Sequence, residues 1–504
     1  MTANWGGGYV TDIHYDHGYY REQSPTQLRL ACLLSGVAVD LPQEGAHYLE
    51  LGCGQGIGAL VVAASNPSWR VTAVDFNPAH VAAARALARE AGLGNVTFLE
   101  ADLTEFAETA TAAALPEADI VTMHGVWSWV APAVRAGIVR LLKAKLRAGG
   151  IAHVSYNALP GWQGLLSMQR LVREAGIRLA ARSDRQAQAG FALLREMAAT
   201  EPHGLTADSR MTAWLAEVGG YTGTYLAHEF MNAHWSPCWQ ADVAADMAEA
   251  RLDWVGSAGL IENFAELAMT APQRAIYDRF EDPAMRELLK DLCAARTLRH
   301  DIYMRGARRM TVGARDAALS ELTLALIVPQ DRVQLEVQVA AGRAELSPAF
   351  YGPVVAMLGA GPARVAELLH APGAVATREN PAELAGLLVG TRQAAVVARP
   401  GAAPTEASLS LNAALARRLA MTENLNRAAV LASPMLGAGL PCATADLFVA
   451  GQKMAGRTEP DLEAWVAQLG ETLDAENQGR LREALARGWD EMLPLMRRLG
   501  TVPA

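Results

Sequence analysis

The fold is decided by the stretch Glu50-Leu51-Gly52-Cys53-Gly54-Gln55-Gly56-Ile57-Gly58, which leaves a short apolar run and opens a helix. Its glycines permit a tight turn and let a ligand lie close against the backbone. Asp75 ends the next apolar run about twenty residues later, where it is placed to accept hydrogen bonds from ribose hydroxyls. Asp102 follows a third run and is placed to bond an adenine amino group. A dinucleotide enzyme needs room here for a pyrophosphate, whereas Glu50 suits a cationic ligand. A Rossmann-type turn with another ligand, or with none, is the alternative.

Apolar runs and helical segments alternate over residues 45–156. The expected strands are 46–51, 70–74, 96–99, 118–123 and 151–155, and the expected helices are 57–65, 78–91 and 132–146. Five strands interleaved with helices predict an open parallel sheet with right-handed crossovers. A long helical stretch follows from 163 to about 220. After a helix at 240–251, two more apolar runs at 252–255 and 301–304 are expected to be strands.

The pattern changes after about residue 308. Segments 323–328 and 333–339 predict a strand pair around a turn at 330–332. The next predicted elements are helices at 351–358, 362–369 and 381–389 and a strand at 394–398. The tail from Leu409 is expected to be mostly helical, and the Pro/Gly/Ala stretch 399–404 is the best candidate for a hinge.

Composition and charge exclude several classes of protein. The chain has 504 residues, 51% of them hydrophobic, and a formal net charge of -9, so it is an ordinary globular protein without a broad nucleic-acid footprint. Five scattered cysteines without CxxC spacing disfavour a disulfide framework and a zinc site. His228, Glu229 and His234 do not have the spacing of a metal site on one helix, so no metal is expected. No apolar run suits a membrane helix and no signal peptide is visible, which favours the cytoplasm.

The turn, Asp75 and Asp102 together resemble the class I S-adenosylmethionine-dependent methyltransferases. Five more segments narrow this resemblance: YDHGYYREQSP at 15–25, HGVWSWV at 124–130, SYNALPGW at 155–162, HEFMN at 228–232 and LDWVGSA at 252–258. They look like the bacterial methyltransferases that carry a methyltransferase regulatory domain. That group includes lysine methyltransferases acting on outer-membrane proteins. The resemblance covers about the first 310 residues.

The resemblance implies an α/β fold. It consists of a Rossmann-like class I methyltransferase sheet with a large helical insertion, plus a mostly helical α+β C-terminal domain. The implied divisions are an N-terminal lid at 1–42, a cofactor-binding core at 43–162, a helical insertion at 163–222, a regulatory region completing the sheet at 223–310, a winged-helix-like accessory domain at 311–400 and a helical region at 401–504. The insertion is expected to cap the acceptor pocket or to form a homodimer contact.

The resemblance also implies S-adenosylmethionine as the cofactor, with its methionine portion near Glu50 and the glycines, its ribose at Asp75 and its adenine at Asp102. By the same resemblance, the aromatic N-terminal segment folds over the cofactor, with Tyr20 and Arg21 near its carboxylate. The predicted cofactor-binding set is Tyr20, Arg21, Glu50, Gly52, Cys53, Gly54, Gly56, Asp75, Phe76, Asp102, Leu103 and His124.

In such folds the methyl acceptor sits over the carboxyl ends of the fourth and fifth strands. The predicted catalytic set there is His124, Trp127, Tyr156 and Asn157. His124 is the titratable candidate, and aromatic rings favour a sulfonium or an ammonium. A backbone-bonded loop histidine is the alternative for His124, and plain packing is the alternative for Trp127 and Trp129. The run from His124 to Trp127 lacks the Asn/Asp-Pro-Pro-aromatic signature of enzymes that methylate base amines.

The leading hypothesis is protein-lysine N-methylation. A methyltransferase acting on a small molecule or a surface glycan is the first alternative. A non-enzymatic S-adenosylmethionine-binding regulator is the second.

Overall fold

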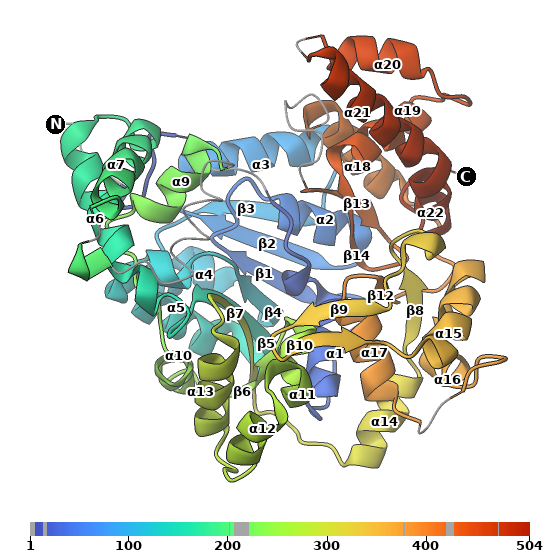
Figure 1. Cartoon of the computed structure of the whole chain (residues 1–504), viewed down its shortest axis with the longest axis horizontal. Coiled ribbons are helices and arrows are strands. Elements are labelled where there is room, and N and C mark those ends of the chain that lie inside the picture. Colours follow the sequence, from blue (N-terminus) through green and yellow to red (C-terminus); the bar gives the residue numbers. More distant parts are fainter. Residues whose placement is uncertain are drawn as a thin grey trace.

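The computed structural model describes residues 6–13, 18–200, 202–205, 221–375, 379–419, 428–471 and 473–503. Within these ranges the central sheet has seven strands in the order β3-β2-β1-β4-β5-β7-β6 (Figure 1). Their bounds are β1 His47–Leu51, β2 Arg70–Asp75, β3 Val96–Glu100, β4 Ala118–Met123, β5 Leu146–Asn157, β6 Leu252–Ser257 and β7 Leu298–Arg305. Strands β1 to β5 are parallel, whereas β7 is antiparallel to both β5 and β6. The predicted parallel sheet is confirmed, and β6 and β7 extend it.

Side chains of the sheet alternate between two apolar layers. In β1, Tyr48 joins the core shared with α1, α2 and α3, whereas Leu49 and Leu51 join the core shared with α4, α5 and α10. Both faces are therefore covered, as a parallel sheet requires. The helices of these layers are α1 Pro25–Leu34, α2 Ile57–Ser65, α3 Pro78–Glu90, α4 Ala110–Ala114, α5 Pro132–Lys145 and α10 Gln240–Ala248.

Local sequence explains where the helices begin. The side chain of Asn77 accepts a hydrogen bond from the backbone N–H of Ala79 at 2.9 Å, and Pro78 occupies the first turn of α3. α13 begins in the same way, with Asp282 accepting from the N–H of Met285 at 2.8 Å. Between β6 and β7 the chain forms α11 Ala265–Ala268, α12 Ala271–Tyr277 and α13 Pro283–Ala294.

The helical insertion forms a module with its own apolar core (green in Figure 1). It contains α6 Leu166–Leu179, α7 Ser183–Ala198 and the following α9 Gly223–Phe230. The side chain of Asp12 accepts hydrogen bonds from the N–H and the hydroxyl of Ser183, which ties the N-terminal segment to α7. The helical prediction for 163–220 is confirmed up to residue 198, and residues 206–220 lie outside the described ranges.

The next part of the chain contains one predicted pairing that is wrong. β8 Thr323–Leu326 pairs with β11 Ala363–Arg364 and β12 Ala394–Val397, whereas β9 Glu336–Val339 pairs with β10 Gly342–Glu345. The reason lies in the side chains. β8 is apolar and mostly buried, whereas β9 alternates exposed polar residues with half-buried valines. The helices around these sheets are α14 Val312–Ser320, α15 Pro348–Ala360, α16 Val365–Leu368 and α17 Pro381–Gly390.

The tail is mostly helical, as predicted, but it also contains a buried hairpin that the sequence pattern did not reveal. β13 Ala428–Ser433 and β14 Ala438–Ala443 pair antiparallel, with Gly437 (φ 62°) in the tight connection. Neither strand alternates apolar with polar residues, because β13 is buried over most of its length and β14 over its first half. The surrounding helices are α18 Glu406–Leu419, α19 Thr444–Met454, α20 Leu462–Leu469, α21 Ala475–Arg487 and α22 Leu493–Arg498.

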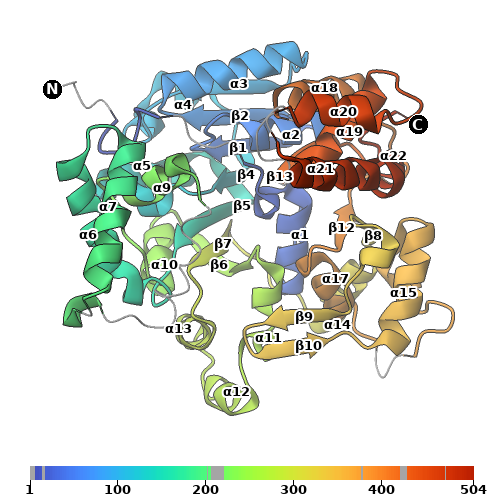
Figure 2. The same cartoon turned by 45° about the horizontal axis from the view of Figure 1, so that its top comes forward.

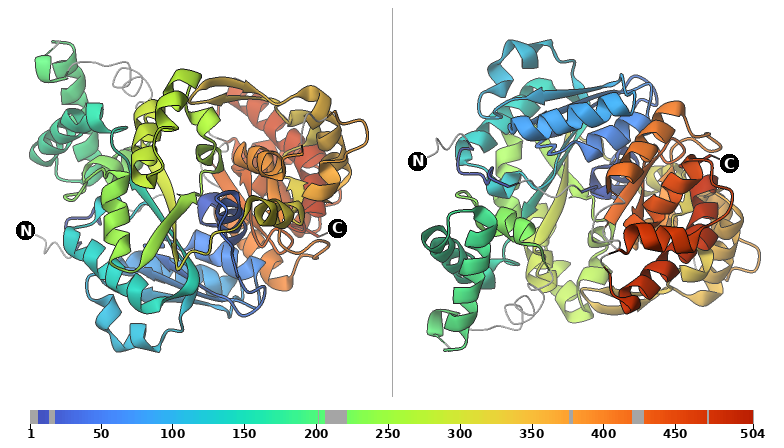
Figure 3. Two further views of the ribbon diagram at one scale, coloured as in Figure 1. Left: turned by 90° about the horizontal axis from the view of Figure 1, so that it is seen from below. Right: turned by 90° about the horizontal axis from the view of Figure 1, so that it is seen from above.

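The hairpin docks on the end of α2, so the C-terminal part shares its core with the sheet. Ser65 and Asn66 donate to the carbonyls of Ala438 and Gly437, both at 3.0 Å. Arg399 donates to the side chain of Asn66 at 3.0 Å, which anchors the stretch predicted as a hinge. Figures 2 and 3 show these orange and red elements at the end of the molecule away from the green insertion. Among the described residues, no helix has the length and apolarity needed to cross a bilayer.

Candidate functional site

A cavity of about 330 Å³ opens at the carboxyl ends of β1, β2 and β4. This edge is where ligands bind in open α/β sheets, because the strand order reverses there. Most of the predicted cofactor-binding residues line it: Tyr20, Glu50, Gly52, Cys53, Gly54, Gly56, Asp75, Phe76, Asp102, Leu103 and His124.

The glycine-rich turn gives the cavity a floor of bare backbone. Gly52 has φ 69° and its N–H donates to the carbonyl of Val74 at 2.8 Å, which joins the ends of β1 and β2. A Cβ on Gly52 would lie 2.3 Å from a methyl of Val126, and a Cβ on Gly56 would lie 2.5 Å from Phe98. Neither turn position therefore tolerates a side chain.

Asp75 is held in place by the turn that it faces. Its carboxylate accepts from the N–H of Gly54 at 2.8 Å and from the N–H of Asn77 at 2.9 Å. His80 lies 3.5 Å from the same carboxylate. Each oxygen still has a lone pair to offer, so Asp75 can accept hydrogen bonds from two neighbouring hydroxyls.

Glu50 is a buried acid that lines the cavity without a full set of partners. Its side chain is 5% exposed, and Oε2 has no hydrogen-bond partner among the described residues. The carboxylate lies over Gly58, where a Cβ would be 3.0 Å from Oε1. Burial raises the pKa of Glu50 to about 8, although the N–H of Ala59 and the side chain of Gln23 oppose the rise. A cation in the cavity would restore the charged form.

Asp102 and Leu103 form the rim beyond Asp75. Asp102 is exposed, and its carboxylate accepts from the N–H of Thr104 at 2.8 Å. Leu103 is buried beside Val134 of α5, which also lines the cavity. A flat heterocycle fits this arrangement, with apolar contact on one side and an acceptor at its edge.

His124 and Tyr20 form the opposite end of the cavity. Their rings stack with centroids 3.5 Å apart, and His300 stacks behind His124 at 5.4 Å. Burial, and then the neighbouring His300 and His153, hold the pKa of His124 well below its usual range. His124 is therefore neutral at physiological pH, where one ring nitrogen can donate a hydrogen bond and the other can accept one.

Two aromatic residues outside the predicted cofactor set also line the cavity; the sequence placed Trp129 near the methyl group but did not assign Tyr9. Tyr9 lines the cavity with its ring edge-on to Phe76 at 5.6 Å. Tyr9 lies in a glycine-rich N-terminal segment, where this single aromatic side chain was the only sequence feature that could have indicated a site residue. Trp129, for which packing was the alternative, also lines the cavity, and its indole N–H donates to the carbonyl of His228 at 3.1 Å.

Four predicted site residues lie away from the cavity wall. Arg21 points to the C-terminal part, where it donates to the carbonyl of Val389 at 2.9 Å. Trp127 is fully buried in the core beneath α5, in line with the packing alternative, and Asn157 donates through its backbone to Ser128. Tyr15 of the N-terminal segment lies outside the described residues.

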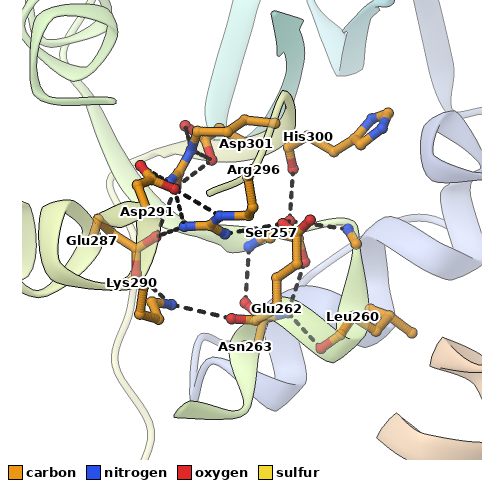
Figure 4. Close-up of polar contacts among 12 residues, drawn as sticks. Ser257, Leu260, Glu262, Asn263, Glu287, Lys290, Asp291, Arg296, His300 and Asp301 are labelled. Atoms are coloured by element: carbon orange, nitrogen blue, oxygen red, sulfur yellow. Dashed lines mark hydrogen bonds and ion pairs between the residues drawn. The ribbon is translucent and has the colours of Figure 1, made fainter. Parts of the chain in front are cut away.

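Tyr156 is the fourth predicted site residue that lies away from the cavity wall, after Arg21, Trp127 and Asn157. A buried ionic cluster explains its position. Its hydroxyl donates to Asp301 of β7 instead of facing the cavity. Arg299, which is fully buried, bonds Asp301 at 2.9 Å, Asp291 at 2.7 Å and Glu287 at 2.7 Å. Figure 4 shows these carboxylates converging between α13 and β7. The cluster occupies the hydroxyl of Tyr156 and gives it a structural role in joining β5 to the region after residue 223.

Comparison with known families decides the class of protein. Residues 49–150 match the family described as a methyltransferase domain, and residues 222–305 match the family described as a predicted methyltransferase regulatory domain. The chain is an S-adenosylmethionine-dependent methyltransferase. The first match covers the glycine turn, Asp75 and Asp102, and the second contains β6 and β7 of the same sheet.

The methyltransferase is similar in fold or sequence to several known proteins. The fold of PKMT2 from Rickettsia typhi, solved in complex with AdoHcy, matches 97% of this chain and 99% of that chain with a TM-score of 0.70 and 16% identity. An uncharacterized protein of Synechocystis is 28% identical over 98% of this chain and 99% of its own length. A carboxy-S-adenosyl-L-methionine synthase of Dichelobacter nodosus is 28% identical over 27% of this chain and 55% of its own length.

The cavity of the methyltransferase fits its cofactor. S-adenosylmethionine supplies an electrophilic methyl group on a positively charged sulfur. A buried carboxylate oxygen without a partner at Glu50 suits a cation, and the bare turn suits close approach of a ligand. Over the described residues, no group of three or more histidine, cysteine, aspartate or glutamate side chains is arranged to hold a metal ion.

Proposed function

We propose that this methyltransferase transfers a methyl group to a lysine side chain of a protein acceptor. The whole-length match with PKMT2, a protein lysine methyltransferase, carries this assignment. That match includes the helical insertion and the C-terminal part, whereas the carboxy-S-adenosyl-L-methionine synthase matches 27% of the chain. The helical insertion and the C-terminal part, which we expect to select the acceptor, thus have the same fold in PKMT2 and in this chain.

The cofactor is bound by the cavity residues in the order that the sequence suggested. Glu50 and the glycine turn hold the methionine portion, Asp75 holds the ribose hydroxyls, and Asp102 with Leu103 holds the adenine. The fixed carboxylate of Asp75, with both oxygens already oriented by backbone N–H groups, supports this assignment. The methyl group then lies toward Tyr20 and His124.

The parts of the chain have distinct roles in this proposal. Residues 43–162 bind the cofactor, and residues 223–310 complete the sheet and border the acceptor. The winged-helix-like region 311–400 and the helical region 401–504 contact a partner protein or stabilise the sheet through the β13–β14 hairpin. The segment from 1 to 42 covers the cofactor, which the position of Tyr9 and Tyr20 supports.

The assembly and the cellular site belong to the same proposal. A homodimer forms through the insertion, where Leu166, Ile177 and Leu179 of α6 are exposed apolar side chains. The protein acts in the cytoplasm, which its five unpaired cysteines support. Light scattering of wild type beside a Leu179→Glu variant tests the dimer, because the charged variant is expected to be monomeric.

A labelling experiment tests the acceptor. The protein is incubated with methyl-labelled S-adenosylmethionine and, separately, with lysate protein or a metabolite extract, and mass spectrometry locates the label. Label on lysine residues supports the proposal. Label confined to the small-molecule fraction rejects it in favour of the small-molecule or glycan alternative, and cofactor binding without turnover favours the regulator. Asp75→Ala serves as the variant with weakened cofactor binding.

A further inference from the structure

Three tyrosines and one acid gather beside the cofactor cavity on the side of α9. They are Tyr9, Tyr20, Tyr225 and Glu229, a set that we call the acceptor cage. Tyr9 and Tyr20 line the cavity, and Tyr225 and Glu229 lie on α9 in the part of the chain that matches the regulatory family. Nothing in the binding of the cofactor accounts for this acid.

Backbone hydrogen bonds on both sides of Tyr9 fix its position. The carbonyl of Gly8 accepts from the N–H of Ala233 at 2.7 Å, and the N–H of Val10 donates to the side chain of Asn232 at 2.9 Å. The N-terminal arm is thus pinned to the residues that follow α9. The ring of Tyr9 is therefore held between that helix and the cavity.

The helix itself is fixed against the cavity wall. Trp129 lines the cavity and donates to the carbonyl of His228, the residue before Glu229. Tyr225 and Glu229 are four residues apart, so they lie on one face of α9. That face is half-buried, whereas Leu226, Ala227 and Phe230 point into the core of the helical module.

Glu229 has the properties of a group that receives a cation. Its carboxylate makes no hydrogen bond or ion pair with the described residues, although the residue is half-buried. The ring of Tyr9 lies 5.8 Å from the ring of His228, the residue before Glu229. Burial first, and then nearby charges that include Glu229 and Tyr20, raise the pKa of both Tyr9 and Tyr225, as expected for four groups that lie near one another. Burial raises the pKa of Glu229 to about 7. A carboxylate of this kind exchanges protons near neutral pH.

We propose that Glu229 binds the ammonium group of the acceptor lysine and takes up its proton, while Tyr9, Tyr20 and Tyr225 surround the amine. This assignment rests on the proposed lysine acceptor and adds the catalytic base to it. Aromatic faces attract an ammonium ion, and a half-buried carboxylate pairs with it. The acid that prepares the acceptor thus comes from the regulatory region and not from the methyltransferase core.

Proton transfer from the acceptor to Glu229 precedes methyl transfer. The N–H bond of the lysine ammonium breaks and its proton moves to a carboxylate oxygen of Glu229, which leaves a neutral amine. The lone pair of that amine forms the new N–C bond to the methyl group while the S–C bond breaks and its electron pair returns to sulfur. The methylated amine carries the positive charge away, and Glu229 then releases its proton to solvent.

Three variants test this role. In Glu229→Gln the side chain keeps its shape but cannot take the proton, and we expect lysine labelling of lysate protein to slow roughly 100-fold or more. Glu229→Asp keeps the carboxylate and is expected to recover part of the rate. Glu249→Gln changes an exposed glutamate at the end of α10 and serves as the matched control, with wild-type turnover expected.

Binding measurements separate a catalytic role from a structural one. Calorimetry should show affinity for S-adenosylhomocysteine unchanged within about twofold in Glu229→Gln, because that residue does not line the cofactor cavity. In the complex with S-adenosylhomocysteine, n-butylammonium chloride should bind wild type at least ten times more tightly than Glu229→Gln, roughly the value of a charge-assisted contact. The neutral n-butanol should not distinguish the two proteins.

The outcomes keep the two proposals apart. Lysine labelling by Glu229→Gln at the wild-type rate, or equal binding of n-butylammonium by both proteins, overturns the role of Glu229 and leaves the lysine acceptor intact. A wild-type protein that labels only hydroxyl groups or small molecules without an amine overturns the lysine acceptor and the base together.

Discussion

Protonation of Glu50 should control the affinity of the cofactor cavity for its ligand. The unliganded protein keeps this carboxyl protonated at neutral pH, because burial raises its pKa to about 8. A ligand that carries an ammonium or sulfonium beside the carboxyl favours the ionised form and expels the proton. Affinity for S-adenosylhomocysteine should therefore rise with pH up to about 8, and Glu50→Gln should remove this dependence.

The size of the effect follows from the ionised fraction. Half of the Glu50 side chains are ionised at a pH equal to the pKa, and about one in a hundred is ionised two units below it. If only the ionised form binds the ligand cation, the association constant falls roughly 50-fold from about pH 8 to about pH 6, which is about 2.3 kcal/mol. Asp75 and His80 are unchanged between the two proteins, so their contributions cancel in the comparison.

Isothermal titration calorimetry at several pH values measures the ratio of wild-type to Glu50→Gln affinity. Taking this ratio also cancels the titration of the ligand's own amino group. Titrations in buffers of different ionisation enthalpy should show wild type releasing close to one proton near pH 6.5, and the glutamine variant none. A ratio that is flat across this range would refute the reasoning, since Glu50 would then already be ionised or would not face the cation.

Other perturbations test the remaining assignments. Asp75→Ala should weaken cofactor affinity by ~1–3 kcal/mol in the same titrations, through lost charge-assisted hydrogen bonds. Tyr156→Phe should leave turnover within a few-fold but lower the free energy of unfolding in urea by about 1–2 kcal/mol, because Asp301 loses a buried donor. Burial would raise the pKa of Glu287, but Lys290 and the two buried arginines outweigh it and lower the pKa to about 2. The folded state should therefore lose up to about 3 kcal/mol as pH falls from the ordinary value of 4.5 toward 2, which acid titration of unfolding measures. Gly439→Val should lower the melting temperature, because a Cβ there would lie 2.3 Å from Val430 within the hairpin and 3.0 Å from Val61 of α2. An unchanged melting temperature would argue against tight packing of the hairpin on α2.

Much of the cofactor site could be predicted from sequence because its features are local. Gly52, Asp75 and Asp102 stand at the ends of consecutive parallel strands, and such ends meet at one edge of a sheet. Strand order and turn chemistry therefore place them together without any knowledge of long-range packing. The same logic put His124, which follows β4, on the cavity wall.

The acceptor side was less predictable because it is assembled from distant segments. Tyr156 ends a strand like the others, but an antiparallel neighbour, β7, brings Asp301 to its hydroxyl. The sequence around Tyr156 contains no sign of that neighbour. Tyr9 and Glu229 are brought beside the cavity by hydrogen bonds between the N-terminal arm and the residues after α9, and by the bond from Trp129 to His228.

The amino-acid sequence by itself determined the strand–helix alternation, the glycine turn and the acids at the strand ends. Periodicity and turn residues act over a few positions, so they can be read directly along the chain. Only the tertiary structure decided the pairing of β8 with β12, the docking of the β13–β14 hairpin on α2 and the gathering of the acceptor cage. These contacts join residues that are far apart in the chain, from 68 positions between Leu326 and Ala394 to 373 positions between Ser65 and Ala438. They form because buried apolar faces and unpaired polar groups find partners in space.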